Sequence, residues 1–319
     1  MIQAAIVGGG GYTAGELIRI LLYHPEVALA WIHSNSQSGK PIYTTHEDLV
    51  GETDLHFTNQ LDFTGIDVLF LCSGHGQSAR FLDENTLPEN LAVIDLSHDF
   101  RLHESFIYGL PELNKARIEG SKRIANCGCF ATAIQLGLLP LAKAGLLNEP
   151  VNITAITGAT GAGQSPGATT HFSWRNNNLS VYKPFEHQHL PEIERSLEQL
   201  QGTDLPPLHF IPVRGDFARG IFASMYTKCA LNEEEAYALF EDFYKTAAFT
   251  RVVRQNPNLK QVVNTNRALV HLEKHGDQLL ILSLIDNLLK GASGQAVQNM
   301  NLIFGFPETT GLQLKATVF

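Results

Sequence analysis

The start of the chain constrains its fold more than any other segment. Residues 2–7 form an apolar run of strand length, four consecutive glycines follow at 8–11, and helix formers occupy 16–23. The glycines fit G-x-G-x-x-A or G-x-x-G-x-x-A, depending on which one begins the motif, and both patterns end at Ala14. A strand, a glycine turn and a helix in this order let a pyrophosphate approach the N–H groups of the helix. We therefore expect a Rossmann-type dinucleotide-binding domain at the N-terminus.

Further strand candidates follow at residues 27–33, 68–71 and 92–96. The last two end in small polar segments at 72–76 and 97–99. Ligands bind at such ends in open parallel sheets. The pattern predicts an α/β fold for this part of the chain.

After residue 150 the strand candidates become longer, and two of them flank a Lys274-His275-Gly276-Asp277 turn. This pattern predicts a second, α+β domain with a largely antiparallel sheet. We place the dinucleotide-binding domain at 1–128, together with a C-terminal helix at 291–319, and the second domain at 129–290. The strand candidates of the second domain are residues 151–157, 221–230, 268–273 and 278–285.

The residues after the second strand candidate indicate which dinucleotide is bound. An NAD enzyme usually has an acidic residue near the end of this strand, where it binds the ribose hydroxyls. Residues 33–40 read HSNSQSGK and contain no Asp or Glu. Hydroxyls, amides and a lysine can accept a 2′-phosphate, whereas the alternative is an ordinary polar loop. We expect NADP(H), bound with the help of Ser34, Ser36, Ser38 and Lys40.

Two cysteines, Cys127 and Cys129, precede a helix candidate at residues 130–147. A thiol at a helix N-terminus lies near free backbone N–H groups and the positive end of the helix dipole. Both stabilise the thiolate, which is the nucleophilic form. The alternative is that both cysteines are small buried hydrophobic residues.

His187 and His189 lie two residues apart, and Glu192 follows. Imidazole exchanges protons near neutral pH, and a neighbouring carboxylate can fix its tautomer. In an extended segment the two rings would point to opposite sides. Zinc ligation by both cysteines and both histidines is an alternative, but Cys-x-Cys is tighter than the usual Cys-x2-Cys spacing, so we expect no metal.

The composition excludes several classes of partner. The chain of 319 residues has a net charge of −9 and a pI near 5.8, which argues against nucleic acid. No apolar run reaches the ~20 residues of a membrane-spanning helix, and we expect no signal peptide because a strand candidate begins at once. Four cysteines in a chain of this length suggest reduced thiols. We expect a cytoplasmic enzyme without a nucleic-acid or membrane partner.

Seven motifs occur in order along the chain: VGxxGYT at 7–13, DLSxxFR at 95–101, YGLPE at 108–112, GxxGAG at 158–163, HxHxPE at 187–192, RGI at 219–221 and DNLxKGAxxQA at 286–296. Together they resemble the N-acetyl-γ-glutamyl-phosphate reductase family, NADPH-dependent enzymes of arginine biosynthesis. The resemblance covers almost the whole length. It implies reduction of an N-acyl-γ-glutamyl phosphate to the semialdehyde through a cysteine thioester, in a homo-oligomer whose second domain carries catalysis and dimerisation.

The resemblance also assigns the catalytic residues. The family's nucleophile motif, N-P-G-C-Y-P-T, aligns its reactive cysteine with Cys129, and its H-x-H-x-P-E motif places the catalytic histidine at His189. This chain departs from the nucleophile motif at Cys127, Phe130 and Ala131. Because Cys127 follows an asparagine, as the nucleophile of the related aspartate-semialdehyde dehydrogenases does, it is the rival nucleophile.

The remaining site residues follow from the anionic substrate and from the resemblance. A planar guanidinium binds carboxylate or phosphate with two hydrogen bonds, so arginines are expected around the substrate. We predict substrate contacts at Arg219, Arg101, His187 and Glu192. We predict further cofactor contacts at Gly8, Gly11, Tyr12, Thr13, Ala14, His75, Gly158 and Asn287.

Three alternatives remain from the sequence. An aspartate-semialdehyde dehydrogenase would use the same chemistry, and so would an enzyme that acts on the N-succinyl form of the substrate. A non-catalytic NADP-binding regulator could keep the fold and lose the chemistry. It would be expected to lack the cysteine or the histidine, and both are present.

Overall fold

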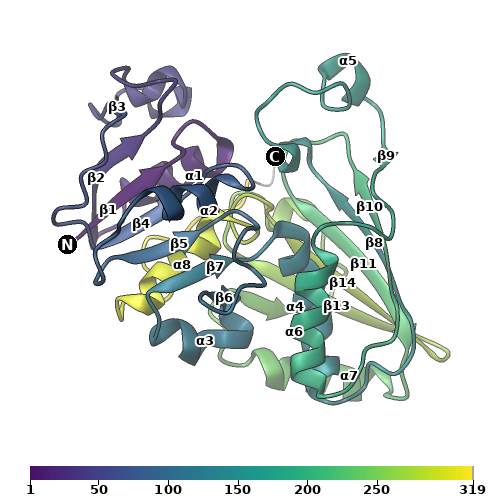
Figure 1. Ribbon diagram of the computed structural model, residues 1–319. Helices are drawn as coiled ribbons and strands as arrows, with labels where there is room; N and C mark the ends of the chain where they lie inside the picture. Colours follow the sequence, from purple (N-terminus) through teal and green to yellow (C-terminus); the bar gives the residue numbers. More distant parts are fainter. Residues whose placement is uncertain (318–319) are drawn as a thin grey trace. The chain divides into compact units, whose positions relative to one another are not determined.

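The computed structural model describes residues 1–317, and the chain divides into two compact units. The first unit comprises residues 1–127 and 292–313. The second comprises residues 128–291 and the described end of the chain from Leu314. Figure 1 labels the elements of both units. The predicted combination of a Rossmann-type unit and a largely antiparallel α+β unit is confirmed.

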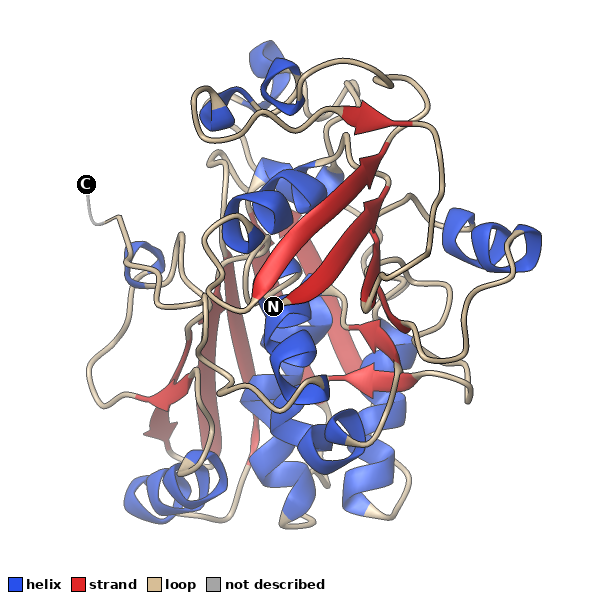
Figure 2. Cartoon of the chain, turned by 90° about the vertical axis from the view of Figure 1, so that its left-hand side faces the viewer, coloured by secondary structure: helices blue, strands red, loops and turns tan. Residues whose placement is uncertain are grey.

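The first unit is built on a seven-stranded sheet in the order β3-β2-β1-β4-β5-β7-β6, and every pair of neighbours is parallel. Its strands fan out beside the N-terminus in Figure 2. All residues of β4 and β5 are buried, as expected for strands covered on both faces. The strands are β1 (Ile2–Val7), β2 (Val27–His33), β3 (Phe57–Thr58), β4 (Val68–Leu71), β5 (Ala92–Asp95), β6 (Ile107–Gly109) and β7 (Arg123–Asn126).

The helices of the first unit are α1 (Tyr12–Leu21), α2 (Gln77–Glu84), α3 (Pro111–Glu119) and α8 (Ser293–Ile303). Helix α8 packs against both α1 and α3. Its buried residues include four amide side chains besides apolar ones. The Asn299 side chain donates to the carbonyl of Gly109 at 2.9 Å and to Oδ1 of Asn126 at 3.0 Å. These bonds tie α8 to the ends of β6 and β7.

The closing helix is shorter than the predicted segment of 291–319. It ends at Ile303 because Gly305 adopts a left-handed conformation (φ +72°) and Pro307 follows, and both residues oppose helix continuation. The chain then continues in turns and loops, and from Leu314 it belongs to the second unit. Residues 318 and 319 of the predicted segment lie outside the described residues.

The second unit contains a seven-stranded sheet in the order β12-β13-β14-β11-β8-β10-β9. Its neighbours are antiparallel except for the pairs β12/β13 and β8/β10. The predicted strands 151–157 and 278–285 match, whereas 268–273 extends to His275 and 221–230 ends at Lys228. The strands are β8 (Val151–Thr157), β9 (Ser180–Val181), β10 (Leu208–Arg214), β11 (Ile221–Lys228), β12 (Thr250–Val252), β13 (Ala268–His275) and β14 (Gln278–Ile285).

Helix α4 is the central helix of the second unit. It packs against β11, β13 and β14 and also against helices α6 and α7. Its Ala/Leu-rich sequence suits this position, since every residue from Phe130 to Ala142 is buried. The helices of this unit are α4 (Cys129–Lys143), α5 (Phe172–Arg175), α6 (Leu190–Gln201) and α7 (Glu233–Tyr244).

Candidate active site

The glycine turn joins β1 to α1 in the first unit. Gly8 has a positive φ of 83°, and a Cβ atom there would lie 2.7 Å from the backbone nitrogen of Ser73, so only glycine fits. Gly11 is the N-cap of α1, and it provides no side-chain cap for the N–H groups of the first turn, where Tyr12 and Thr13 lie. Ala14 is buried beneath this turn. The uncapped N-terminus fits an anionic pyrophosphate.

The loop after β2 lies at the same edge of the sheet. Val7 pairs with His33, and the N–H of Gly9 donates to the carbonyl of His33 at 2.9 Å. The side chain of Ser34 is buried, Ser38 is half-buried, and Ser36 and Lys40 are exposed. This edge therefore offers hydroxyls and one ammonium group next to the glycine turn, which suits a phosphate on the ribose.

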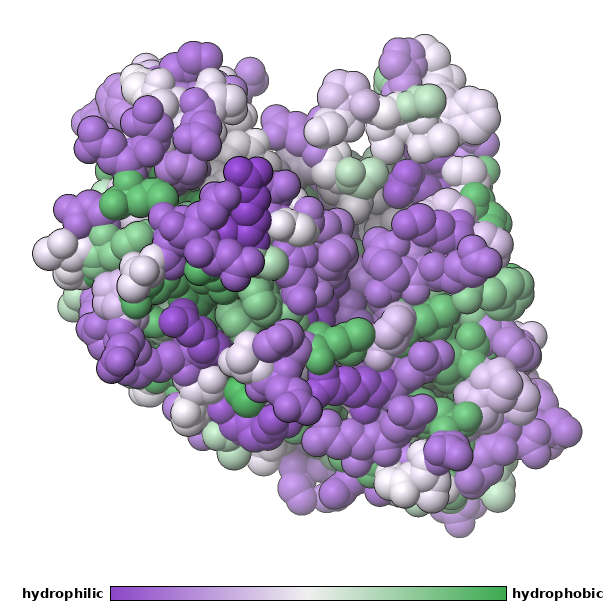
Figure 3. Space-filling view, in the orientation of Figure 1, coloured by the Kyte–Doolittle hydropathy of each residue, from purple (hydrophilic) through white to green (hydrophobic). Residues whose placement is uncertain are grey.

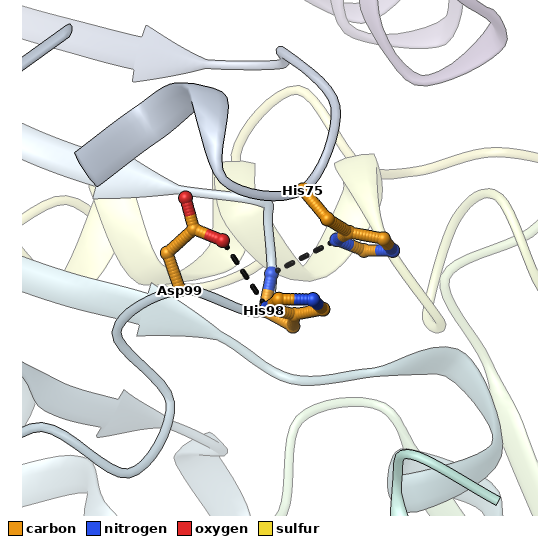
Figure 4. A group of neighbouring side chains, drawn as sticks. All are labelled: His75, His98 and Asp99. Atoms are coloured by element: carbon orange, nitrogen blue, oxygen red, sulfur yellow. Dashed lines mark hydrogen bonds and ion pairs between the residues drawn. The ribbon is translucent and has the colours of Figure 1, made fainter. Parts of the chain in front are cut away.

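His75 follows β4 at this edge and stacks on His98, which follows β5 (Figure 4). The ring centroids are 4.0 Å apart and the planes differ by 10°. The backbone N–H of His98 donates to Nδ1 of His75 at 3.3 Å, and Nδ1 of His98 lies 3.1 Å from Oδ1 of Asp99. Asp99 in turn accepts from the N–H groups of Gly76 and Ala79 at the start of α2.

This is the only group of three metal-ligand side chains with neighbouring donor atoms among residues 1–317. Parallel stacked imidazoles direct their in-plane lone pairs side by side rather than toward one point. Both oxygens of Asp99 already accept backbone hydrogen bonds. Asp99 therefore caps the start of α2, and the two exposed imidazole rings stack beside it.

Two predicted cofactor residues, Gly158 and Asn287, belong to the second unit. Asn287 accepts from the N–H of Gly220 at 2.6 Å and donates to the hydroxyl of Thr160 at 3.0 Å. The N–H of Gly158 donates to the carbonyl of Gly220 at 2.9 Å. In this unit both residues join the loop after β8 to the loop before β11.

Cys129 is the first residue of α4, as the sequence predicts for a thiol at a helix start. Gly128 is the N-cap, no side chain caps the helix, and its first turn contains no acidic residue. The Cys129 side chain is half-buried, whereas Cys127 is buried at the end of the first unit. Burial, and secondarily Asp95, raise the pKa of Cys72, so this thiol resists ionisation. Helix position and access favour Cys129 as the reactive thiol.

His189 and Glu192 lie against this turn in the second unit. A Cβ atom at Gly128 would lie 2.4 Å from Nε2 of His189, so glycine is required for the close approach. The N–H of Gly128 donates to Oε2 of Glu192 at 3.1 Å, and Oε1 of Glu192 is 3.9 Å from Nε2 of His189. Glu192 thus holds the turn by a hydrogen bond and places a carboxylate near the imidazole.

The expectation that His187 points away from His189 is wrong. The two rings are 4.6 Å apart at 74°, and both contact the ring of Phe130. The segment is not extended here, because His189 has helical dihedral angles (φ −88°, ψ −11°) as the N-cap of α6. Burial, followed by the charges of Lys183 and Arg214, lowers the pKa of His187 to about 4. His187 is therefore neutral at physiological pH.

The two predicted substrate arginines already have protein partners. Arg219 binds both oxygens of the buried Asp286 at 3.1 Å, from Nε and Nη2. Arg101 lies in the first unit, where its Nε donates to the carbonyl of Asn126 at 2.9 Å. Each of these bonds fixes a loop end, and in Arg219 the charge is compensated by the protein itself.

Comparisons with known proteins identify the family of this chain. Residues 3–121 match the family model "Semialdehyde dehydrogenase, NAD binding domain", and residues 129–287 match "Semialdehyde dehydrogenase, dimerisation domain". The chain is 58% identical over 322 residues to N-acetyl-γ-glutamyl-phosphate reductases of Phocaeicola vulgatus and of Christiangramia forsetii, with full coverage of both chains in each case. The chain belongs to the N-acetyl-γ-glutamyl-phosphate reductase family. Its first unit accordingly binds a nicotinamide dinucleotide.

Solved structures of proteins with low sequence identity share the fold of this chain. Aspartate semialdehyde dehydrogenase II of Vibrio cholerae, complexed with ASA, is similar with a TM-score of 0.77 at 16% identity, covering 96% of this chain and 98% of that one. Aspartate semialdehyde dehydrogenase of Candida albicans with NADP gives a TM-score of 0.71 at 15% identity, covering 95% and 98%. At this level of identity the likeness shows the fold alone.

The surface facing the viewer in Figure 3 is largely hydrophilic, with apolar residues in separate patches. Among the described residues, no helix has the length and apolar character needed to cross a membrane.

Sequence reasoning missed Arg214 and Tyr182 in this reductase. The guanidinium carbon of Arg214 lies 4.6 Å above the Tyr182 ring, and Tyr182 contacts His187 with ring centroids 5.7 Å apart. The available signal was alternation along residues 208–214. Leu208, Phe210 and Pro212 are buried, so Arg214 is a cation at an inward-facing position.

Proposed function

We propose that this protein reduces N-acetyl-γ-glutamyl phosphate to N-acetylglutamate semialdehyde with NADPH, in arginine biosynthesis. The observation that carries the proposal is the placement of Cys129 at the uncapped start of α4, against the turn that His189 and Glu192 hold. Membership of the reductase family supports the substrate.

In the first step the Cys129 thiolate attacks the γ-carbonyl, and inorganic phosphate leaves, which gives a thioester. Gly128 is the N-cap and its N–H is engaged by Glu192, so the N–H groups within the first turn of α4 remain to stabilise the oxyanion. The same N–H groups and the helix dipole favour the thiolate before attack.

A reduced nicotinamide held by the first unit would supply the hydride that converts the thioester to a thiohemiacetal. His189 gives a proton to the developing oxygen and takes it back as the aldehyde departs, which restores the thiolate. Glu192, with Oε1 3.9 Å from Nε2 of His189, favours the protonated imidazole by its charge. His187 is a weaker proton acceptor, since burial lowers its pKa to about 4.

The finer assignments complete the proposal. The first unit binds NADP(H) in preference to NAD(H), through Ser34, Ser36, Ser38 and Lys40, and the second unit carries catalysis and pairs with a second copy of the chain. The dimerisation-domain match of residues 129–287 supports this pairing. Arg101, Arg219 and His187 stay predicted substrate contacts, His75, Gly158 and Asn287 stay predicted cofactor contacts, and the compartment is the cytoplasm.

The test is the reverse reaction with purified protein, followed as NADPH formed from the semialdehyde, phosphate and NADP⁺. We expect activity with N-acetylglutamate semialdehyde and none with aspartate semialdehyde. Preference for the N-succinyl compound would change the acyl group and keep the reaction class. Activity with aspartate semialdehyde alone would overturn the proposal.

A further inference from the structure

Arg214 is an arginine without a carboxylate partner in the second unit. It ends β10 on the inward side, where Phe210 packs on Phe130 with ring centroids 5.2 Å apart. Phe130 directly follows Cys129 in α4. The register of the sheet therefore places Arg214 on the face that the thiol-bearing helix covers.

Tyr182 is the neighbour of Arg214 across the β9/β10 pair. Arg214 pairs with Ser180, and the N–H of Tyr182 donates to the carbonyl of Pro212 at 3.2 Å, so Tyr182 and Arg214 are diagonal neighbours on one face. The guanidinium stacks on the ring at 4.6 Å. Its Nε is buried and has no hydrogen-bond partner among the described residues.

Two other arginines of this unit have the carboxylate partner that Arg214 lacks. Arg219 binds Asp286, and Arg254, which also stacks on a tyrosine (Tyr237, 4.1 Å), binds the carboxylate of Glu234. No acidic residue of the described part of the chain forms an ion pair with Arg214. In a chain with a net charge of −9, a half-buried cation without a counterion indicates an anionic ligand.

The charge of Arg214 is felt next to the thiol. After burial and Lys183, it helps to lower the pKa of His187. Burial, followed by the charge of Cys129, raises the pKa of Tyr182 against the opposing charge and hydrogen bond of Arg214. The Tyr182 phenol is therefore protonated and able to donate. The loop between Tyr182 and His187 is also strained, because Lys183 (φ +45°) and Phe185 (φ +61°) adopt left-handed conformations. Such strain is concentrated at functional sites.

We propose that Arg214 and Tyr182 form a subsite that binds the carboxylate of the substrate while its acyl group reacts at Cys129. This inference rests on the proposed function. One guanidinium and one neutral hydroxyl match a monovalent carboxylate better than a divalent phosphate, and a guanidinium offers two parallel N–H groups to it. The carboxylate stays on the molecule through both steps, whereas the phosphate leaves in the first.

The first test measures Michaelis constants in the reverse direction for Arg214→Met, Arg214→Lys and Tyr182→Phe. In Arg214→Met we expect KM for the semialdehyde to rise roughly ten- to hundredfold, the size of a lost hydrogen bond to a charged group, with KM for phosphate unchanged. Arg214→Lys should recover part of the loss, and Tyr182→Phe should raise the same KM by less. Arg254→Met, the matched control, should change neither. A raised KM for phosphate alone would overturn the proposal.

The second test does not depend on the reaction. Cys129 is alkylated with iodoacetate, which carries a carboxylate, and with neutral iodoacetamide, and modification is followed on the Cys129 peptide. The ratio of the iodoacetate rate to the iodoacetamide rate should fall in Arg214→Met and stay unchanged in Arg254→Met. An unchanged ratio in Arg214→Met would refute the subsite. If no semialdehyde is turned over but the ratio falls, the proposed function fails and the carboxylate subsite stands.

Discussion

Two regions of the molecule differ in the groups that form them. The cofactor edge is the glycine turn at residues 8–11 with the strand ends beside it in the first unit, and the thiol region is the surroundings of Cys129 in the second unit. At the cofactor edge the backbone makes the predicted site: Gly8 and the uncapped start of α1 lie at the strand ends, which backbone hydrogen bonds hold in place. In the thiol region side chains make the site. Phe130, His187 and His189 meet there, although they belong to segments about sixty residues apart.

This difference decides what a substitution does in each region. A backbone site tolerates changes in neighbouring side chains, because its donors are N–H groups that every residue except proline has. A side-chain site depends on the chemistry of single residues, since a thiol and an imidazole have no substitutes. We therefore expect large effects in the second unit and graded effects in the first.

The largest effect is expected at the thiol. Cys129→Ser should lower turnover on the order of 10⁴- to 10⁶-fold, as removal of a catalytic nucleophile or its partner does, while NADPH binding, followed by fluorescence, stays intact. Cys127→Ser should only reduce the rate. If Cys127→Ser is the inactive variant, the reactive thiol is the one after Asn126 and the comparison of regions must be redrawn.

His189→Asn should have the next largest effect. The amide cannot exchange a proton near neutral pH, so turnover should fall roughly 10²- to 10⁴-fold. His187→Asn should raise KM more than it lowers turnover. Rates of both variants across pH 6 to 9 separate the roles. A pH-dependent limb that persists in His189→Asn and vanishes in His187→Asn would mean that the two histidines exchange roles.

A graded effect is expected in the first unit. Ser36→Glu or Lys40→Glu should weaken NADPH binding about tenfold and leave NADH binding nearly unchanged, because a carboxylate repels the 2′-phosphate. Dissociation constants for both cofactors give the answer. Equal efficiency of the unmodified enzyme with NADPH and NADH would remove the argument for a phosphate contact in residues 33–40.

The smallest effect concerns pH and the stability of the second unit. The pKa of His187 is lowered to about 4 in the folded chain, so between about pH 6.5 and 4 only the unfolded chain binds this proton. The free energy of unfolding should therefore fall as pH falls through this window. In His187→Asn the slope should be smaller, by somewhat less than the ~1.4 kcal/mol per pH unit that one proton contributes. Urea unfolding at pH 7, 5.5 and 4.5 measures it, and parallel slopes would contradict the assignment.

The cofactor edge could be read from the sequence because its information is local. The strand at 2–7, the glycines and the loop at 33–40 are each recognisable within a few residues, and parallel strands bring their ends to one edge. In the second unit, the thiol at a helix start was likewise a local signal. The orientation of His187 was not, because its ring packs against Phe130, which lies in a distant segment of the chain. The ion pair of Arg219 was not a local signal either, since its partner Asp286 lies 67 residues away.

Arg175 holds together the loop between β8 and β9. Its buried guanidinium donates to the carbonyls of Thr169, Asn178 and Arg214 and to the hydroxyl of Ser180. One side chain thus closes the loop on itself and fastens it to the end of β10. The loop should open as a single cooperative unit, visible as amides of residues 169–180 that exchange with solvent together. Such an opening would also break the hydrogen bond to the carbonyl of Arg214, so the loop and the strand end that carries this arginine are mechanically linked.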